Sequence, residues 1–281
     1  MSSILTNNGA MVALQTLKSI NSDLDKTQNA ISTGKDIATA KDGSAIWGIS
    51  KVMESDVAGF EAVSDALSLG ESTVAVASAG AERVVEVLKE IKELAISANS
   101  ENVDFTKIQA DISERSAQVA SIISAAQFNG ANLLATDVDG NGATSLGVLS
   151  SIDRVGTAAP TPASITVNSV DFEANIDLVA DLTAITDTAT AATALAEVEV
   201  FLQTAIDGAS SLGASAARIR DQNEFVGKLT DAMKSGIGSL VDADMEATSA
   251  KLQALQTQQQ LGVQALSIAN QAPQTILSLF R

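Results

Sequence analysis

The residues that could do chemistry in this chain are few, and the clearest candidates form an acidic loop. Asp137, Asp139 and Asn141 follow the spacing D-x-[DN]-x-[DN]-G that opens a calcium-binding loop. Position twelve of such a loop supplies a glutamate that binds the ion through both oxygens, and that position here is Val148. No helix pair is expected to flank the loop. The pattern therefore favours a plain turn over a calcium site.

A second group of carboxylates recurs along one predicted helix. Glu82, Glu86, Glu90 and Glu93 follow one another at steps of three or four residues, which could place two carboxylates together as an acid pair. Lysines at 89 and 92 are interleaved with them, so the pattern favours a solvated charged face. We expect no catalytic role for these residues.

Composition excludes several classes of function. Cysteine and histidine are both absent, which removes disulfides, thiolate nucleophiles, Ser–His catalysis and Cys/His zinc sites. The net charge of −17 would repel nucleic acid and anionic membrane surfaces. No stretch is apolar enough to span a membrane, and the N-terminus MSSILTNNGAMVAL lacks the pattern of a secretory signal peptide. We therefore expect no enzyme, no cofactor and no membrane insertion.

The negative charge is concentrated in the middle of the chain. Residues 1–43 sum to zero and residues 241–281 to −1, whereas residues 44–135 and 136–190 each sum to −7. Nearly neutral segments can pack densely against copies of themselves, while a strongly acidic segment favours contact with water. The pattern predicts ends that associate and a middle that is solvated.

Hydrophobic periodicity predicts long helices that position these charges. A seven-residue repeat is apolar at every position from Ile46 to Ala95, which predicts a helix of ~50 residues and ~80 Å. A second helix is expected from about Asp104 to the turn at 127–130, and a third from about Ala189, antiparallel to the first. Between them, Gly, Pro, Asp and the alternating segment 164–170 predict two or three short strands.

Each end of the chain has a weaker seam, meaning a row of mostly apolar residues at seven-residue spacing on one face of a predicted helix. The N-terminal seam has Ala10, Leu17, Leu24 and Ile31, with residues 14, 21 and 28 at the companion positions. The C-terminal seam is interrupted by Gln259 and Gly262, and residues 236–238 (Gly-Ile-Gly) predict a helix break before it. Helices with such seams are marginal alone because most helical stability comes from packing. The two ends are expected to pair and to be completed by other chains.

The motifs in these ends resemble those of bacterial flagellins. The C-terminal part has D-A-D-M-E at 242–246, then L-Q-x-x-Q-Q-Q-L-G, and finally A-N-Q-A-P-Q-T-I-L-S-L-F-R. The N-terminal part matches the family pattern S-T-G-x-x-I-x-x-A-x-D at 32–42, with Ala45, Ile49 and Ser50 following. The segment Q-F-N-G-x-x-L-L at 127–134 is also similar. The resemblance covers roughly residues 1–135 and 190–281.

The resemblance implies a fold, a function and partners. The fold would be mainly α, a long antiparallel helical bundle with a small β-hairpin region at about 131–188. Residues 1–43 and 240–281 would pair as a coiled coil in the inner tube of a filament, and residues 44–239 would form the rod of the outer wall. With only about fifty-five residues between the helical parts, we expect no large outer domain. The chain would be a secreted subunit of the extracellular flagellar filament, with the flagellar export apparatus, a secretion chaperone, the filament cap and copies of itself as partners.

Two sets of residues follow from the resemblance. Lys89, Glu90, Lys92, Glu93 and Leu94 align with the stretch that the innate-immune flagellin receptor reads, but Glu90 replaces the family's central arginine, so weak activation is expected. The apolar side chains expected at the assembly interface are Leu14, Leu17, Leu24, Ile31, Met245, Leu252, Leu255, Leu266, Ile276, Leu277, Leu279 and Phe280.

Two other interpretations stay open from the sequence. A protein of the hook–filament junction shares the flagellin ends, although usually not the complete C-terminal motif, and would not form long homopolymers. A signalling coiled coil would also show long alanine-rich heptads. Such a protein would need membrane spans and a clean helical hairpin where this chain has β-like sequence.

Overall fold

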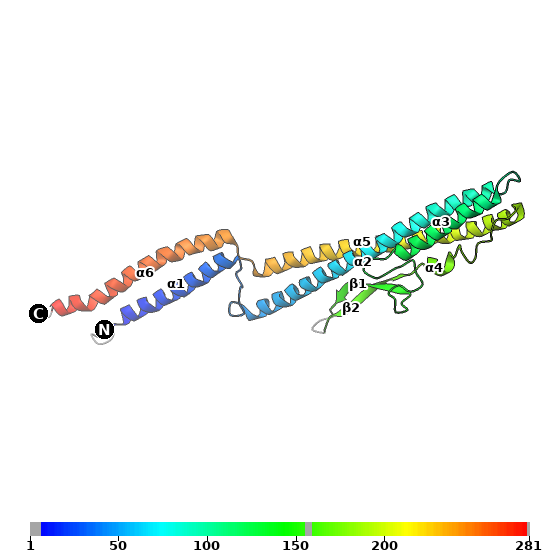
Figure 1. Cartoon of the computed structure of the whole chain (residues 1–281). Coiled ribbons are helices and arrows are strands. Elements are labelled where there is room, and N and C mark those ends of the chain that lie inside the picture. The colour runs from blue at the N-terminus through cyan, green and yellow to red at the C-terminus, as the bar shows by residue number, and fades with distance from the viewer. Residues whose placement is uncertain (1–6, 155–158, 280–281) are drawn as a thin grey trace. The chain divides into compact units, whose positions relative to one another are not determined.

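The computed structural model describes residues 7–154 and 159–279, with side chains as far as residue 271. Figure 1 shows the elements in chain order. The chain is mainly helical with one small antiparallel sheet, as predicted. The elements are α1 (Asn8–Thr33), α2 (Ser44–Ser97), α3 (Phe105–Ala125), β1 (Ser145–Asp153), β2 (Thr161–Asn168), α4 (Phe172–Asn175), α5 (Thr188–Val241) and α6 (Met245–Leu279).

The chain forms two compact units. The terminal unit comprises residues 1–57 and 232–281, and the central unit comprises residues 58–231. The divisions between them fall inside α2 and α5 rather than in loops. Among the described residues, no helix is both long enough and apolar enough to cross a membrane.

In the central unit, α2 and α5 run antiparallel, as the periodicity predicted. The hydroxyl of Ser64 donates to the side-chain oxygen of Asn223 at 2.7 Å, whereas Lys92, further along α2, pairs at 2.5 Å with Glu199, which comes earlier on α5. Asn223 is a polar residue on the side of α5 that contacts α2. Its amide nitrogen also donates to Ser68 at 3.2 Å, so two serines of α2 satisfy it.

The core of the central unit is built largely from small and branched side chains. The buried residues of α2 repeat at steps of three and four, which is the spacing of one helix face. Leu67, Leu88 and Ile91 of α2 and Leu212 and Ile219 of α5 are among the largest fully buried side chains. This unit therefore has a continuous core of its own.

The hairpin β1–β2 packs on the helices at glycine positions. Ser145 pairs with Asn168 and Asp153 with Thr161, with an irregularity between Leu149 and Ser151. A Cβ atom at Gly70 of α2 would lie 2.5 Å from a methyl group of Val148, which is buried. The backbone of the strand can approach the helix because residue 70 has no side chain. Gly70 is thus a position of α2 that admits the hairpin.

The segment after α3 turns where the sequence predicted. Asn129 and Gly130 have positive φ angles of 50° and 83°, values that asparagine and glycine tolerate best. The side chain of Asn132 then donates to the carbonyl of Ile123 at 2.7 Å and accepts from the backbone of Leu134 at 2.9 Å. This turn buries residues 133 and 134 in the core.

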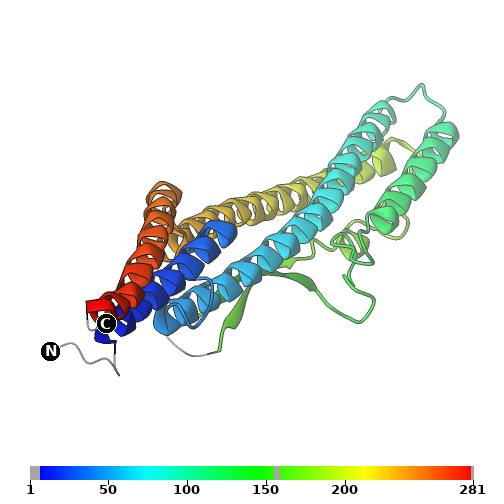
Figure 2. The ribbon, with the colours of Figure 1, turned by 90° about the vertical axis from the view of Figure 1, so that its left-hand side faces the viewer.

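In the terminal unit, α1 and α6 lie side by side (Figure 2). Asn7 contacts Ala269 and Asn21 contacts Gln259, so residue numbers rise along one helix as they fall along the other. The pairing of the terminal helices is therefore confirmed, with the two helices antiparallel.

One predicted detail of α1 is wrong. The companion positions that face inward are residues 13, 20 and 27, not 14, 21 and 28. Thr27 is 4% exposed, whereas Leu14 is 58% exposed. Steps of three and of four residues both fit one helix face, so spacing alone allowed either residue 13 or residue 14. Residue 14 was preferred because leucine is more apolar than the alanine at 13. The first seam, through Ala10, Leu17, Leu24 and Ile31, does lie on the paired side.

The predicted helix break at residues 236–238 is also wrong. Helix α5 continues through both glycines to Val241, and the break falls at residues 242–244. Ile237 and Val241 are buried against Val57, with Met53 and Met233 packed around them. Burial of this turn offsets the roughly 1 kcal/mol that each glycine costs a helix relative to alanine.

Candidate assembly interface

Polar side chains define where α1 and α6 begin. The side-chain oxygen of Asn7 accepts from the backbone of Ala10, which caps α1, and its amide donates to the carbonyl of Ala269 on α6 at 2.8 Å. Asp244 accepts from the backbone nitrogens of Glu246 and Ala247 at 3.0 and 3.1 Å, which caps α6. Glu246 adds a negative charge in the first turn, where the helix dipole favours it. The D-A-D-M-E motif thus sets the start of α6.

The two interruptions in the α6 seam have specific partners on α1. A Cβ atom at Gly262 would lie 3.2 Å from Leu17 and 3.8 Å from Ile20, so the missing side chain makes room for both. The amide of Gln259 donates to the side-chain oxygen of Asn21 at 2.7 Å. A polar pair at one level of a helical seam can fix its register.

The segments that join these helices to the rest of the terminal unit pair with each other. The backbone nitrogen of Asp36 donates to Val241 at 2.8 Å, and that of Ala243 donates to Gly34 at 2.9 Å. Gly34 ends α1 with a φ of 70°, a conformation that glycine adopts without strain. Ile37 packs against the cluster of Val57 and Val241. In the pattern S-T-G-x-x-I, Gly34 therefore ends α1 and Ile37 anchors the turn that follows it.

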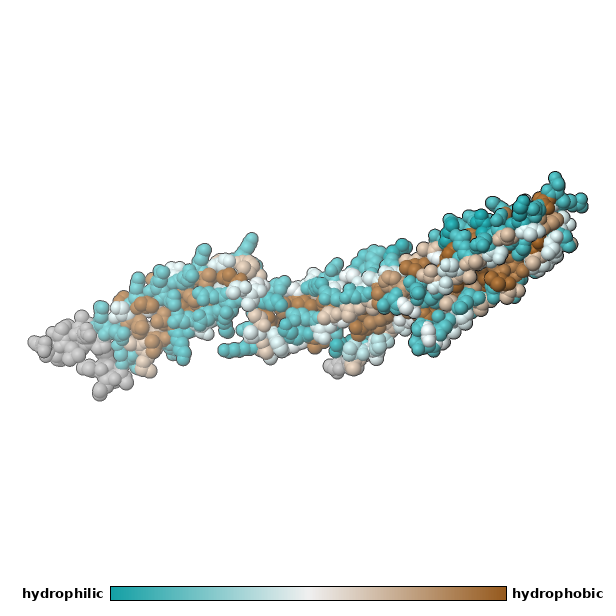
Figure 3. All heavy atoms as spheres, in the orientation of Figure 1, coloured by the Kyte–Doolittle hydropathy of each residue, from teal (hydrophilic) through white to brown (hydrophobic). Residues whose placement is uncertain are grey.

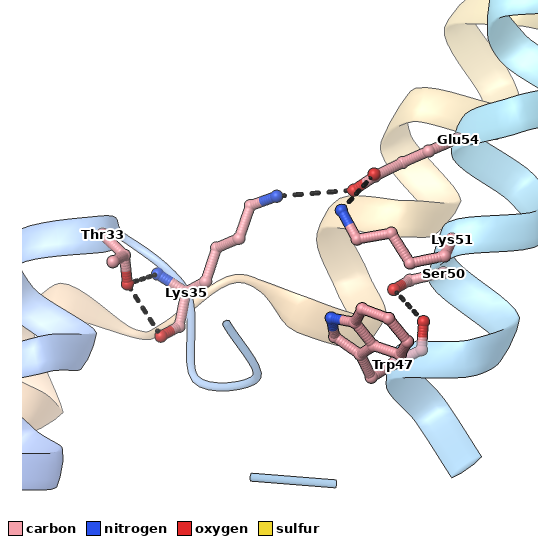
Figure 4. Close-up of polar contacts among 6 residues, drawn as sticks. All are labelled: Thr33, Lys35, Trp47, Ser50, Lys51 and Glu54. Carbon is pink, nitrogen blue, oxygen red and sulfur yellow. Dashed lines mark hydrogen bonds and ion pairs between the residues drawn. The ribbon is translucent and has the colours of Figure 1, made fainter. Parts of the chain in front are cut away.

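Charged residues hold the start of α2 close to the end of α1 (Figure 4). The carboxylate of Glu54 receives Lys51 at 2.5 Å and Lys35 at 3.5 Å, and the hydrogen bond from Lys51 lowers the pKa of Glu54 below its ordinary value. Two hydrogen bonds lie close to this carboxylate in the same segment. The backbone nitrogen of Lys35 donates to Thr33, and the buried hydroxyl of Ser50 donates to the carbonyl of Trp47. The contacts connect residues 33–54 within one unit.

The predicted interface residues fall into three groups. Leu255 is 7% exposed, and Leu17, Leu24, Ile31, Leu252 and Leu266 are half-buried between α1 and α6. Leu14 and Met245 are 58% and 44% exposed. Residues Ile276, Leu277 and Leu279 lie in α6 beyond the described side chains, and Phe280 lies outside the described residues.

Five exposed apolar side chains near the chain ends escaped the prediction. They cluster in two short segments, one on each helix. A signal for part of this set was present, because residues 247, 254, 261 and 268 are all apolar at a seven-residue spacing. The five are Met11, Val12, Leu261, Val263 and Ile268, exposed by 63%, 63%, 58%, 53% and 69%.

The acidic loop at 137–142 is held by its own carboxylates. One oxygen of Asp137 accepts from the backbone of Asp139 and Gly140, and the other accepts from Gly142 at 2.8 Å. Asp139 accepts from Asn141 and Ala143, and these backbone hydrogen bonds lower the pKa of Asp139. The carboxylates therefore serve as turn-stabilising acceptors.

Two ion pairs tie the stretch at 89–94 to its neighbours. Glu90 pairs with Arg115 of α3, and Lys92 pairs with Glu199 of α5. Glu93 is exposed, and Leu94 is half-buried against the core. The glutamate at 90 thus has a local structural partner in this chain.

The two units differ strongly in net charge. The central unit has nine basic and 25 acidic residues, a net charge of −16, and the terminal unit has eight basic and nine acidic residues, a net charge of −1. Copies of the central unit repel one another, whereas copies of the terminal unit do not. The terminal unit is the surface most suited to self-association.

Comparison with known proteins agrees on one family. Residues 4–139 match the model of the bacterial flagellin N-terminal helical region, and residues 198–280 match that of the C-terminal helical region. Flagellin of Brucella melitensis is 43% identical and flagellin FljK of Caulobacter vibrioides 41%, with 100% of this chain covered and 100% and 99% of theirs. A crystal structure of Bacillus cereus flagellin aligns with 59% of this chain and 88% of its own, at 17% identity and a TM-score of 0.47.

Proposed function

The chain belongs to the bacterial flagellins and is a structural subunit of the flagellar filament; we propose that its paired helices α1 and α6 form the contacts that build the filament. Its neighbours there are copies of itself and related flagellins. The hook–filament junction interpretation is not favoured, because the similar relatives are named flagellins over their full length.

The observation that carries the assembly proposal is how little the α1–α6 pair buries. In residues 8–33 and 245–271 only Thr27, Ala30 and Leu255 are buried, although the two segments together contain several leucines and isoleucines. Ordering a residue costs ~1–2 kcal/mol of backbone entropy, and apolar burial is the main term that offsets it. We infer that further copies supply the burial that the pair lacks.

Residues 1–43 and 240–281 are proposed to form the inner tube of the filament, and residues 44–239 its outer wall. The nearly neutral charge of the terminal unit supports dense packing around an axis, and the acidic central unit suits a solvated wall. The short segment between the helical parts supports a wall without a large outer domain.

We propose that the chain reaches the filament by secretion through the flagellar export apparatus, with a chaperone before export and the cap at the growing end. The absence of cysteine and the weakly buried ends suit a chain that is transported unfolded and ordered on arrival. Finding the chain outside cells only when the export apparatus is intact would support this route; export without it would contradict it.

Seeded polymerisation of the purified chain tests the assembly proposal. We expect long tubular filaments from the full chain and none from a chain truncated after Leu240, because the truncation removes α6. Negative-stain electron microscopy distinguishes these outcomes. Filaments from the truncated chain would contradict the role of α6, and no filaments from the full chain would contradict the assembly proposal as a whole.

A further inference from the structure

The central unit contains a cavity of about 520 Å³ beside α3. Its walls come from residues 116–127 of α3, residues 130–140 and residues 173–179, which include part of α4. Helices α3 and α4 contact each other in this part of the chain (Figure 1). Cavities that hold small molecules usually measure ~300–1,000 Å³. This cavity is therefore large enough for a small organic molecule.

The buried part of the cavity wall is apolar. Ile123 of α3 and Val138, Ile176 and Leu178 of the loops line it, and each is at most 6% exposed. Val179 also lines the cavity and is 77% exposed. Hydrophobic patches of this kind interrupt the hydrophilic surface of the central unit in Figure 3. A ligand with an apolar body would cover such surface, and removing apolar surface from water is favourable.

The charged part of the wall is acidic. Asp137, Glu173 and Asp177 line the cavity, and none of the described residues that line it is basic. Arg115 precedes a lining residue of α3, but its charge is paired with Glu90. Negative charges around a concave site attract cations, because the protein wall concentrates their field there. The wall therefore favours a positively charged ligand over a neutral or negative one.

Two of these carboxylates are held in place through one of their oxygens. One oxygen of Glu173 accepts from the backbone of Thr136 at 3.2 Å. One oxygen of Asp177 accepts from the backbone of Val179 and of Ala180, both at 3.0 Å. Within the described part of the chain, the second oxygen of each carboxylate accepts no hydrogen bond. An ammonium or guanidinium group could donate to these oxygens, and such charge-assisted bonds are roughly twice as strong as neutral ones.

We propose that this cavity binds a small organic cation, which has an ammonium or guanidinium group at one end and an apolar body at the other. The apolar body packs against Ile123, Val138 and Ile176, and the cation is bound by the carboxylates of Glu173 and Asp177. This binding site is separate from the proposed assembly contacts, because it lies in the central unit whereas α1 and α6 belong to the terminal unit.

Three molecules of similar size and different charge test the proposal. The phenethylammonium ion, neutral phenethyl alcohol and the phenylpropionate anion share a phenyl ring on a short chain. We expect the ammonium ion to bind the full-length monomer with a dissociation constant of about 1 mM, and the other two to bind at least about tenfold more weakly. Methyl NMR titrations measure these affinities and should show shifts at Val138, Ile176 and Val179. Equal binding of the alcohol, or no binding of the ammonium ion, would overturn the proposal.

Two conservative substitutions test where the cation lies. Asp177→Asn and Glu173→Gln keep an oxygen that can accept the backbone hydrogen bonds but remove the negative charge. Each is expected to weaken binding of the ammonium ion about threefold to tenfold. Asp111→Asn is the matched control, because Asp111 is exposed on α3 and does not line the cavity. An equal loss of affinity in the control would show that net charge alone attracts the ion and would overturn the assignment.

Filling the cavity tests whether the ligand lies inside it. Ala120 lines the cavity from an exposed position on α3, so Ala120→Trp should occupy the space without entering the core. We expect this variant to lose binding of the ammonium ion while its circular dichroism stays unchanged. Ser124→Phe, at another exposed lining position, serves the same purpose if the first variant does not fold. Unchanged affinity in a folded variant would contradict the proposal and would leave the assembly role of α1 and α6 intact.

Discussion

Replacing Leu255 by aspartate is expected to stop filament growth at protein concentrations that support growth of the unmodified chain. Leu255 is the one side chain between residues 245 and 271 that is buried, and it lies on the seam between α6 and α1. An unpaired carboxylate there would have to be desolvated in every assembled subunit, which costs several kcal/mol. We expect the critical concentration to rise at least ~100-fold, since about 1.4 kcal/mol corresponds to a factor of ten.

Gln256→Asp is the matched control for this substitution. It adds the same single negative charge at the neighbouring position, which is exposed. We expect its critical concentration to stay close to that of the unmodified chain, as measured by sedimentation of seeded filaments. Equal effects from the two substitutions would show that charge alone matters and would contradict a buried seam at Leu255. Circular dichroism of the monomers checks that the central unit remains folded in both.

Gly70→Ala is expected to destabilise the central unit. The added methyl would lie 2.5 and 2.6 Å from the two methyl groups of Val148, and Val148 is held in the paired strand β1. Overpacking of this kind costs about 1–3 kcal/mol, which exceeds the gain of up to ~1 kcal/mol from alanine in a helix. We expect the melting temperature of the monomer to fall by several degrees in differential scanning calorimetry.

Gly213→Ala separates packing from helix propensity. Gly213 lies in α5, and a Cβ atom there would meet nothing within 4 Å, so this change should raise the melting temperature slightly. If Gly70→Ala melted at or above the temperature of the unmodified chain, close contact between β1 and α2 would not be what requires glycine at position 70.

Periodicity predicted the helices well because each long helix has one side facing a continuous core. Residues from Val63 to Ala98 show this, since their buried positions follow the seven-residue spacing that the sequence displays. The C-terminal seam was also predicted from the sequence, together with its interruptions at Gln259 and Gly262. What the sequence could not show is that Leu17, Ile20 and Asn21 compensate for those weak points, because such partners depend on the register between α1 and α6.

Two of the errors have a common physical cause. Leu14 was placed on the inner side of α1, yet it is exposed, because α1 has apolar residues on more than one side and the spacing alone does not tell which side faces α6. The same property hid Leu261 and Ile268, which lie one residue away from inner positions of α6. Gly236 and Gly238 misled for a different reason, since tertiary burial of Ile237 and Val241 overrides weak helix propensity.

Hydrogen exchange of the dilute monomer and of the filament tests most directly whether other subunits complete the α1–α6 pair. We predict that amides of residues 8–33 and 245–271 exchange rapidly in the monomer and become protected in the filament. Amides of α2 and α5 in the central unit should be protected in both, because that unit has its own core. Strong protection of both terminal helices in the dilute monomer would show that the pair is stable by itself and would contradict the account.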